Sequence, residues 1–465
     1  MILFLGLAGC SRDPGPEGRI VILVGLDGFR WDYLEKFQPP VLMEMARRGV
    51  TTPTMVPSFP TLTFPNFYTL ATGLRPENHG IIANSMFDPE FEARFSLGSP
   101  AVQEGRWWGG EPIWITAEKQ GVRAACMFWP GSEAEIGGWR PSDWRKYQHT
   151  MPPEERVDTV LDWLARPPAE RPRLITLYFH EADSAGHRYG ADAPETAAAV
   201  AQVDLALGAL QDGVRRLGLE DAVNYVIVSD HGMTGVSPDR VIALDQILDL
   251  ETVQVDFAGA VAGLRPRQGT VDDLYAALSV QPTNYQVFRR EDLPERLHFR
   301  SHRRIPPVVL IPDEGWMVVR EAPRSEGARR AFLRATHGFD PALPSMGALF
   351  IASGPALRRG VILPPFENIH IYSLVCTLLG LHAAPNQGDT RLGDRAIFKK
   401  YPPAIPAILP LSSRHRFDRI RKVQKRRGGR AVDCTGLENR RGESLRGFES
   451  HPLRHDPKSP ANPDK

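Results

Sequence analysis

The run Ile20-Val21-Ile22-Leu23-Val24-Gly25-Leu26-Asp27 is apolar without interruption until it ends in an acid. A half-exposed strand would alternate polar and apolar residues, so this run is typical of a strand that is buried on both faces. Further apolar runs follow at residues 124–129, 174–179, 223–230 and 348–352. The stretch at 20–27 therefore predicts the central strand of a buried, largely parallel sheet.

Amphipathic helices are expected between these strands. One apolar face is marked by Val157, Val160, Leu161 and Leu164, and a longer one by Val200, Val203, Leu207, Leu210, Val214 and Leu217. Both sets have the three- and four-residue spacing of a helix. Strands that alternate with helices indicate an α/β fold with a central, mostly parallel sheet and helices on both faces. In such sheets ligands bind beyond the carboxyl ends of the strands.

The alternation changes between about residues 241 and 330. Short strands are expected there at 285–288, 308–311 and 316–319, and a helix at 272–278. This pattern predicts a smaller inserted α+β subdomain. A chain of 465 residues is long enough for one large α/β unit with such an insertion. We place the main domain at residues 19–389.

The first 18 residues differ from this domain. They begin with an apolar run and contain Leu7-Ala8-Gly9-Cys10, which resembles the end of a bacterial lipoprotein signal, followed by a tether. The run is short and no Lys or Arg precedes it, so an upstream start, a decayed signal and a frayed apolar terminus are alternatives. If the signal is genuine, Cys10 carries a lipid and the protein is exported as a periplasmic or membrane-anchored lipoprotein.

Residues 401–465 form a basic tail, which is predicted to be disordered. The tail has 15 Lys and Arg against 7 Asp and Glu, and it contains few large apolar side chains. A nucleic-acid-binding arm and a shifted reading frame are alternatives for this segment. The net charge of the whole chain is only +1, which argues against a stable nucleic-acid partner. No run of about 18 apolar residues is present, so no membrane-spanning helix is expected.

A loop and helix are expected at Pro57-Ser58-Phe59-Pro60-Thr61-Leu62-Thr63-Phe64-Pro65-Asn66, because its prolines exclude one continuous helix. The helix would begin near Thr63. A hydroxyl in that position faces backbone N–H groups and the positive end of the helix dipole. It suits either an N-cap or a nucleophile that meets a phosphate. This stretch alone favours the N-cap.

Acids and histidines occur near the expected ends of the strands. Those that follow apolar runs are Asp27, Asp183, His187, Asp230 and His231, and His337 precedes the run at 348–352. Three carboxylates and three imidazoles suit zinc and are enough for two ions. Two ions about 3.5–4 Å apart stabilise the attacking and leaving oxygens of a phosphoryl displacement. Metal coordination would also lower the pKa of the Thr63 hydroxyl. With these residues considered, a nucleophile becomes the favoured interpretation of Thr63.

The chain resembles the nucleotide pyrophosphatase/phosphodiesterase family of the alkaline phosphatase superfamily over about residues 19–389. The resemblance lies in the order of Val24-Gly25-Leu26-Asp27-Gly28-Phe29-Arg30, residues 60–66, 72–80 and 128–133, Asp183-Ser184-Ala185-Gly186-His187, Ser229-Asp230-His231-Gly232-Met233 and His337-Gly338-Phe339. It implies an alkaline-phosphatase-like fold with two Zn²⁺ per chain. The implied activity is hydrolysis of nucleotide phosphodiester and pyrophosphate bonds, with release of nucleoside 5'-monophosphates.

The resemblance also implies residue roles. One zinc site would use Asp183, His187 and His337, and the other would use Asp27, Asp230, His231 and the Thr63 hydroxyl. Thr63 would attack phosphorus and form a covalent phospho-threonine, while Asn84 stabilises a non-bridging oxygen. Phe64 and Tyr178 would sandwich the nucleobase, and Tyr147 would line the same pocket. The chain departs from the resemblance at His180, Ala182 and Phe67, where Glu, Pro and His are expected. These departures bear on the substrate and remove no ligand.

Two other functions are compatible with the sequence. The same site would serve a choline phosphodiesterase or a phosphate monoesterase, but Phe64 beside the nucleophile favours a nucleobase. No Lys or Arg adjoins Thr63 to meet the extra charge of a monoester. A lipid-anchored binding protein with an inactive site is expected to lack a ligand, whereas all six acids and histidines are present together with Thr63. The sequence therefore favours a zinc phosphodiesterase that acts on nucleotides.

Overall fold

The structure is a computed structural model that describes residues 15–280 and 283–398. These residues belong to one compact unit. Cys10 and the basic tail lie outside the described residues, so the predictions made for them stay predictions. Within the described part of the chain, no helix is both long enough and apolar enough to cross a bilayer.

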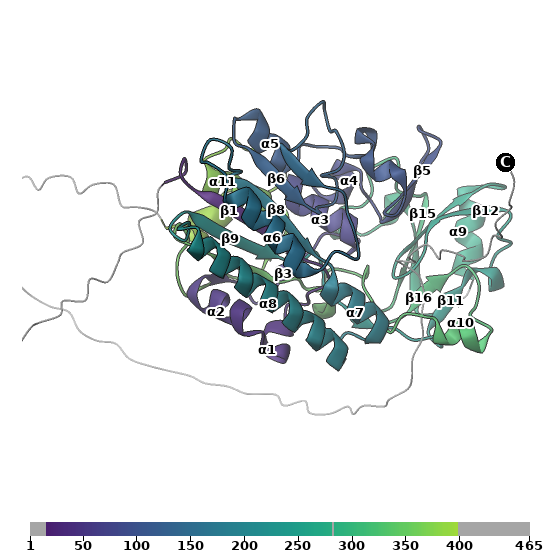
Figure 1. Ribbon diagram of the computed structural model, residues 1–465. Coiled ribbons are helices and arrows are strands. Elements are labelled where there is room, and N and C mark those ends of the chain that lie inside the picture. The colour runs from purple at the N-terminus through teal and green to yellow at the C-terminus, as the bar shows by residue number, and fades with distance from the viewer. Residues whose placement is uncertain (1–14, 281–282, 399–465) are drawn as a thin grey trace, which may run out of the picture. The chain divides into compact units, whose positions relative to one another are not determined.

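The centre of the fold is an eight-stranded sheet with the strand order β19-β2-β18-β9-β1-β8-β6-β7 (Figure 1). β1 (Ile20–Leu26) pairs in parallel with β8 (Leu174–Phe179) on one side and with β9 (Val223–Val228) on the other. Every residue of these three strands is buried. The predicted central strand and its mostly parallel sheet are therefore confirmed. The outer strands are β6 (Ala124–Met127), β7 (Asp143–Arg145), β18 (Phe350–Ser353), β2 (Val50–Thr51) and β19 (Val361–Ile362).

Helices cover both faces of this sheet (Figure 1). On one face α3 (Thr63–Thr72), α5 (Ile113–Lys119) and α11 (His370–Leu379) contact one another. On the other face α8 (Pro194–Arg216) contacts α2 (Pro40–Arg48), α6 (Pro153–Leu164) and α7 (Glu181–Tyr189). Most of the apolar residues predicted for α6 and α8 are buried, with Val160 and Leu210 fully enclosed, whereas Leu161 is half-buried and Leu217, one residue beyond α8, is exposed. The sheet is thus closed to solvent on both sides, which leaves the ends of its strands as the place for chemistry.

The fifth predicted strand runs in the opposite direction from the others. β18 pairs with β9 in an antiparallel manner, with Phe350 opposite Val228. The predicted sheet is mostly parallel, and β18 is one of its antiparallel strands, because an apolar run carries no information about strand direction. The start of β18 consequently lies at the carboxyl end of β9. The segment that precedes β18 therefore reaches the edge at which β1, β8 and β9 end.

A second, four-stranded antiparallel sheet has the order β12-β13-β15-β14. Its strands are β12 (Val253–Phe257), β13 (Ala262–Pro266), β14 (Tyr285–Arg289) and β15 (Val308–Pro312). α9 (Val271–Ser279) starts at a capping box made by Thr270 and Asp273, and its apolar side packs into the core of this sheet. β11 (Val241–Ala243) and β16 (Met317–Val319) pair in parallel. The bounds of the predicted insertion, 241–330, stay a prediction.

A buried ion cluster ties the loop between β14 and β15 to β4 (Ser85–Asp88). Nε of Arg304 donates to Oδ2 of Asp88 at 2.6 Å, and the two side chains are 3% and 0% exposed. The same guanidinium donates to the carbonyls of Gly80 and Trp107 at 2.7 and 2.8 Å. Arg303 also donates to both oxygens of Asp88. Because these partners lie far apart in the sequence, the cluster joins the second sheet to the main body.

Short elements complete the described part of the chain. They are α1 (Tyr33–Phe37), β3 (Met55–Val56), α4 (Pro76–His79), β5 (Ala93–Ser96), β10 (Thr234–Gly235), α10 (Glu326–Arg330), β17 (Ala335–Thr336), β20 (Phe366–Glu367) and α12 (Arg391–Ala396).

Candidate active site

Thr63 is the first residue of α3 and is partly exposed. The N-cap position belongs to Leu62, and no side chain caps the helix. The Oγ1 atom of Thr63 lies 3.4 Å from Nε2 of His231. The hydroxyl therefore stands at the positive end of the helix dipole and faces the acids and histidines at the sheet edge, and it does not act as an N-cap.

The loop before Thr63 is held by the side chain of Asn66, which is fully buried. Its amide nitrogen donates to the carbonyls of Ser58, Pro60 and Leu62 at 3.2, 2.9 and 3.0 Å. Its oxygen accepts from the backbone N–H of Ser58 at 2.8 Å. One side chain thus satisfies four backbone groups in a loop that has no sheet partner. Asn66 fixes the position from which α3, and with it Thr63, begins.

The six predicted acids and histidines converge at the carboxyl ends of the strands. Asp27 follows β1, and α7 starts immediately after β8 and carries Asp183 and His187 one turn apart. Asp230 and His231 follow β9, and His337 follows β17. Nε2 of His187 lies 3.2 Å from Oδ1 of Asp183, and Nε2 of His337 lies 3.5 Å from the same oxygen. Nε2 of His231 lies 2.7 Å from Oδ2 of Asp230 and 3.6 Å from Oδ1 of Asp27.

These side chains form two overlapping groups that could hold metal ions. Ligand atoms of Asp183, His187 and His337 all lie within 4.8 Å of one another, and so do those of Asp27, Asp183 and His231. The first group matches the set that the resemblance implies for one zinc site. The second contains Asp183 where the implied set has Asp230, although Asp230 also contacts His231. Asp183 therefore lies between the two groups.

The hydrogen bonds of the histidines leave lone pairs facing this centre. Nδ1 of His187, His231 and His337 lies 2.9 Å from the carbonyl oxygens of Ala335, Gly232 and Thr61 respectively. Because a carbonyl can only accept, Nδ1 carries the proton, and a neutral ring then presents an unprotonated Nε2. Oδ1 of Asp27, Oδ1 of Asp183 and Oδ2 of Asp230 are buried and accept no hydrogen bond from the described residues. Divalent cations would satisfy these unpaired nitrogen and oxygen atoms, so the donor set fits zinc.

The buried groups of this centre shift one another's pKa values. Burial opposes the charge on both Asp183 and His187, but their attraction lowers the pKa of Asp183 and raises the pKa of His187 to about 9. Burial raises the pKa of Asp27, and repulsion from Asp230 and Asp183 raises it further. Burial also raises the pKa of Asp230 and lowers the pKa of His337. Several carboxylates cannot all remain ionised in so small a buried volume unless positive charge accompanies them.

Besides Asn66, two positioning residues were not recognised from the sequence. Gly28 has φ +64°, and an added Cβ would stand 2.9 Å from the Cα of Asp183, so only glycine lets α7 approach the end of β1 this closely. Its N–H also donates to Oδ1 of Asp230 at 3.1 Å. The Thr61 hydroxyl donates to the carbonyl of Phe339 at 2.8 Å and accepts from the N–H of Gly338 at 3.0 Å. Thr61 therefore holds the His337 segment beside the loop that carries Thr63.

Asn84 and Phe64 lie next to the first turn of α3. Asn84 is buried, and its side-chain oxygen accepts from the backbone N–H of Phe64 at 2.9 Å. This bond sets the orientation of the Asn84 amide beside Thr63. The ring of Phe64 is partly buried and rests against Phe95 and Trp108, with centroid separations of 6.0 Å in both cases.

The side chains of Tyr178 and Tyr147 differ in how far they are exposed to solvent. Tyr178 is 7% exposed, its hydroxyl donates to Oδ2 of Asp27, and its ring packs edge-on against Phe67 at 5.2 Å. Tyr147 is 39% exposed and lies 6.0 Å from Tyr178 between ring centroids. Tyr178 therefore has little free face for a base, in contrast to its expected role in the sandwich. The geometry favours Tyr147 as the exposed aromatic partner.

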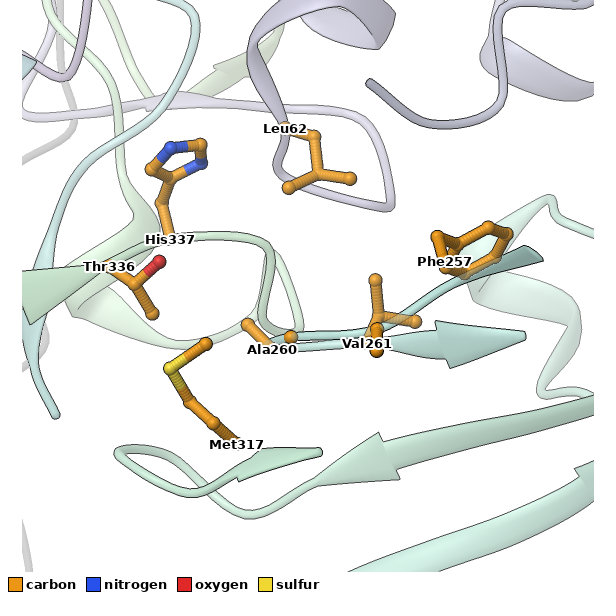
Figure 2. A pocket seen from close by; sticks show the side chains of 9 residues that line it. Leu62, Phe257, Ala260, Val261, Met317, Thr336 and His337 are labelled. Atoms are coloured by element: carbon orange, nitrogen blue, oxygen red, sulfur yellow. The ribbon is translucent and has the colours of Figure 1, made fainter. Parts of the chain in front are cut away.

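A small cavity of about 10 Å³ adjoins His337 (Figure 2). Its lining is apolar apart from Thr336 and His337, and it includes Leu62, Phe257, Ala260, Val261 and Met317. This volume is near the minimum for a single water molecule. The cavity is therefore a packing gap between the 258–261 turn and His337, and it is too small for a substrate.

The fold and the site define an α/β protein with acids and histidines that could hold metal ions at the carboxyl edge of its sheet. The family model for type I phosphodiesterase / nucleotide pyrophosphatase matches residues 21–340. The chain belongs to this family.

Individual relatives agree with this assignment. A Schizosaccharomyces pombe protein described as an uncharacterized pyrophosphatase/phosphodiesterase is 39% identical over 382 residues, which cover 79% of this chain and 78% of the relative. Rat ectonucleotide pyrophosphatase/phosphodiesterase family member 1 is 40% identical over 384 residues, and the match spans 80% of this chain but only 42% of that relative.

A solved structure is also similar to this chain. It is that of an inactive variant of murine ectonucleotide pyrophosphatase/phosphodiesterase 5 in complex with AMP. It has a TM-score of 0.77 at 36% identity, and the match covers 81% of this chain and 100% of the murine chain. The alkaline-phosphatase-like fold expected from the sequence is thereby confirmed.

Proposed function

We propose that this chain is a two-zinc phosphodiesterase that hydrolyses nucleotide phosphodiester and pyrophosphate bonds and releases nucleoside 5'-monophosphates. The observation that carries the proposal is the convergence of the Thr63 hydroxyl with three buried, unpaired carboxylate oxygens and three histidine Nε2 atoms. Membership of the family supports the class of reaction. The AMP complex of the murine relative supports a nucleotide as the ligand.

The residues divide between two zinc sites. Asp183, His187 and His337 would hold one ion, and Asp27, Asp230 and His231 would hold the other together with the Thr63 hydroxyl. The bound ions would supply Lewis-acid stabilisation of the charge on the phosphate oxygens. Tyr178 orients Asp27 through its hydroxyl.

Thr63 is the proposed nucleophile. Its Oγ1 forms a bond to phosphorus as the bond to the leaving oxygen breaks, which gives a phospho-threonine. Water then hydrolyses this ester and releases the nucleoside monophosphate. The start of α3 favours an anionic oxygen at Oγ1, since the helix dipole is positive there. The Asn84 amide, oriented through the N–H of Phe64, donates to a non-bridging oxygen of the substrate.

The nucleobase is proposed to lie between the partly exposed rings of Phe64 and Tyr147. Flat aromatic faces recognise bases by stacking and by excluding water. A choline headgroup or a phosphate monoester in the same site is the alternative.

Turnover of three esters with one leaving group tests the substrate class. We expect kcat/KM to be highest for p-nitrophenyl thymidine monophosphate, lower for p-nitrophenyl phosphorylcholine and lowest for p-nitrophenyl phosphate. Faster turnover of either of the last two would overturn the nucleotide assignment. Zinc-loaded protein that hydrolyses none of them would instead support a binding protein with an inactive site.

Export with a lipid on Cys10 is a separate proposal that rests on residues 7–10 alone. The relatives named above come from yeast and mammals and do not bear on it. Mass spectrometry of the protein from a bacterial membrane fraction tests the proposal, because a lipidated Cys10 would then be the first residue.

A further inference from the structure

Two histidines are stacked beside Tyr147. They lie outside the group of acids and histidines that could hold metal ions. The rings of His149 and His180 have a centroid separation of 4.1 Å and an interplanar angle of 24°. His180 occupies the N-cap position of α7. His149 belongs to residues 146–152, which connect β7 to α6 without helix or strand and are called the 146–152 loop below. The proposed reaction assigns no role to either histidine.

Hydrogen bonds of His180 connect the 146–152 loop to α7. Its Nε2 donates to the backbone carbonyl of His149 at 3.0 Å, and its Nδ1 lies 3.0 Å from the hydroxyl of Ser184. The carbonyl can only accept, so Nε2 carries the proton and Nδ1 accepts from Ser184. Ser184 follows Asp183 in α7. The loop is therefore bonded to the helix that carries Asp183 and His187, two of the candidate metal ligands.

The loop in turn fixes Tyr147. The Tyr147 hydroxyl is hydrogen-bonded to Nδ1 of His149 at 3.0 Å, and the Tyr147 backbone N–H donates to Oε1 of Glu133 at 2.9 Å. Tyr147 lies outside helix and strand, so its orientation depends on side-chain bonds of this kind and on the packing of its ring against Phe128, at 5.3 Å between centroids. Tyr178 connects this ring to the centre, because its own ring lies 6.0 Å from that of Tyr147 and its hydroxyl donates to Asp27.

We propose that His180 and His149 are positioning residues for the base-bearing end of the substrate. They hold the exposed ring of Tyr147 in place relative to α7 and so determine the affinity for substrates that carry a nucleobase. A ring whose orientation is already fixed loses less conformational entropy when a base stacks on it. The two histidines do not contact the reacting phosphate, so they act on KM and leave kcat unchanged. This inference rests on the proposed function.

Steady-state kinetics of His180→Ala with two matched substrates test the inference. p-Nitrophenyl thymidine monophosphate carries a base, whereas methyl p-nitrophenyl phosphate has the same leaving group and no base. We expect KM for the first to rise about fivefold to tenfold, which is the scale of one lost hydrogen bond with its ordering effect. KM for the second substrate, and kcat for both, should stay within about twofold of the wild type.

Further variants separate positioning from a general loss of structure. His180→Gln keeps an N–H donor for the His149 carbonyl and should restore most of the affinity. Tyr147→Phe keeps the aromatic face but lacks the bond to His149, so it should show a smaller rise in KM for the base-bearing substrate only. His382→Ala removes an exposed histidine beyond α11 and should match the wild type.

Three results would overturn the inference. They are an equal change of KM for both substrates, a fall of kcat for both in His180→Ala, or unchanged kinetics in that variant. A fall of kcat for both would mean that α7 and its metal-type residues had moved. If the wild-type enzyme hydrolyses neither substrate, the proposed function itself fails, and this result is distinguishable from a failure of the positioning role.

Discussion

At the scale of single residues, the surroundings of Thr63 distinguish it from a helix-capping threonine. Its hydroxyl faces His231 at 3.4 Å, while the N-cap position belongs to Leu62. The Asn84 side chain is bonded to the backbone of Phe64, the next residue along. Thr63 and Phe64 therefore lie in the first turn of α3, and the Asn84 side chain is bonded to that turn, so the proposed nucleophile, amide donor and aromatic face are neighbours.

Replacing Thr63 by alanine should reduce kcat for p-nitrophenyl thymidine monophosphate at least about a thousandfold, because the nucleophile is removed. Zinc content should change little, since the other ligands remain in place. Thr63→Ser keeps a hydroxyl and should retain measurable activity. An alanine variant within tenfold of the wild type would refute the covalent mechanism.

Replacing Asn84 by alanine should lower kcat about a hundredfold or more, with a smaller change in KM. The reason is that a donor oriented before the reaction stabilises charge that develops only in the transition state. Kinetics with the same substrate measure both constants. An effect confined to KM would show instead that Asn84 serves ground-state binding.

The site residues that could be recognised from the sequence have a residue type that is unusual for their place in the pattern of apolar runs. Acids and histidines at the ends of apolar runs satisfy this condition, and so does Thr63. Gly28, Thr61 and Asn66 escaped recognition because their partners are known only after folding, and Thr61 bonds to a residue 278 positions away. The resemblance predicted that Tyr178 belongs to the site. It did not predict that the Tyr178 hydroxyl donates to Asp27.

At the scale of elements, the apolar runs predicted where strands form but did not predict the direction in which each strand runs. All five predicted strands are present in the central sheet, and β18 alone among them runs antiparallel. The direction of β18 depends on how the chain re-enters the central sheet after it has formed the smaller second sheet. The local pattern of apolar residues does not encode that route. The reversal places the start of β18, and the segment that precedes it, at the edge where the acids and histidines lie.

His79, at the end of α4, is expected to make folding sensitive to acid. The imidazole is buried against α3, with Nε2 3.2 Å from the carbonyl of Pro65 and Nδ1 accepting from the N–H of Ile81 at 3.1 Å. Burial lowers its pKa to about 3. The unfolded chain takes up this proton below about pH 6.5, whereas the folded chain does not until about pH 3. The stabilisation is thus complete above pH 6.5 and is lost as the pH falls.

Denaturant unfolding of wild type and His79→Gln at pH 7.5 and pH 5 measures this effect. The difference in unfolding free energy between the two proteins should shrink by about 2 kcal/mol at the lower pH, because the wild type loses about 1.4 kcal/mol per pH unit below 6.5. Parallel pH dependences for the two proteins would mean that His79 is not the source of the sensitivity.

At the scale of the whole molecule, the Asp88 ion cluster joins the second sheet to the main body. Arg304→Met leaves the buried Asp88 carboxylate with Arg303 as its remaining guanidinium partner. We expect a loss of about 3 kcal/mol in unfolding free energy, since Asp88 loses its buried partner and the carbonyls of Gly80 and Trp107 lose their donor. Arg303→Met, at a 34% exposed side chain, is the matched control and should cost less. Equal costs for the two variants would contradict this account.

Metal binding is the central claim about the molecule, and the zinc content of the purified protein tests it most directly. Elemental analysis should find about two zinc ions per wild-type chain, as expected for a two-metal phosphoryl-transfer site. Asp183→Asn should retain less than one, because Asp183 belongs to both groups of ligand-type atoms. A wild-type chain that binds no zinc, or an Asp183→Asn variant that keeps both ions, would contradict the account.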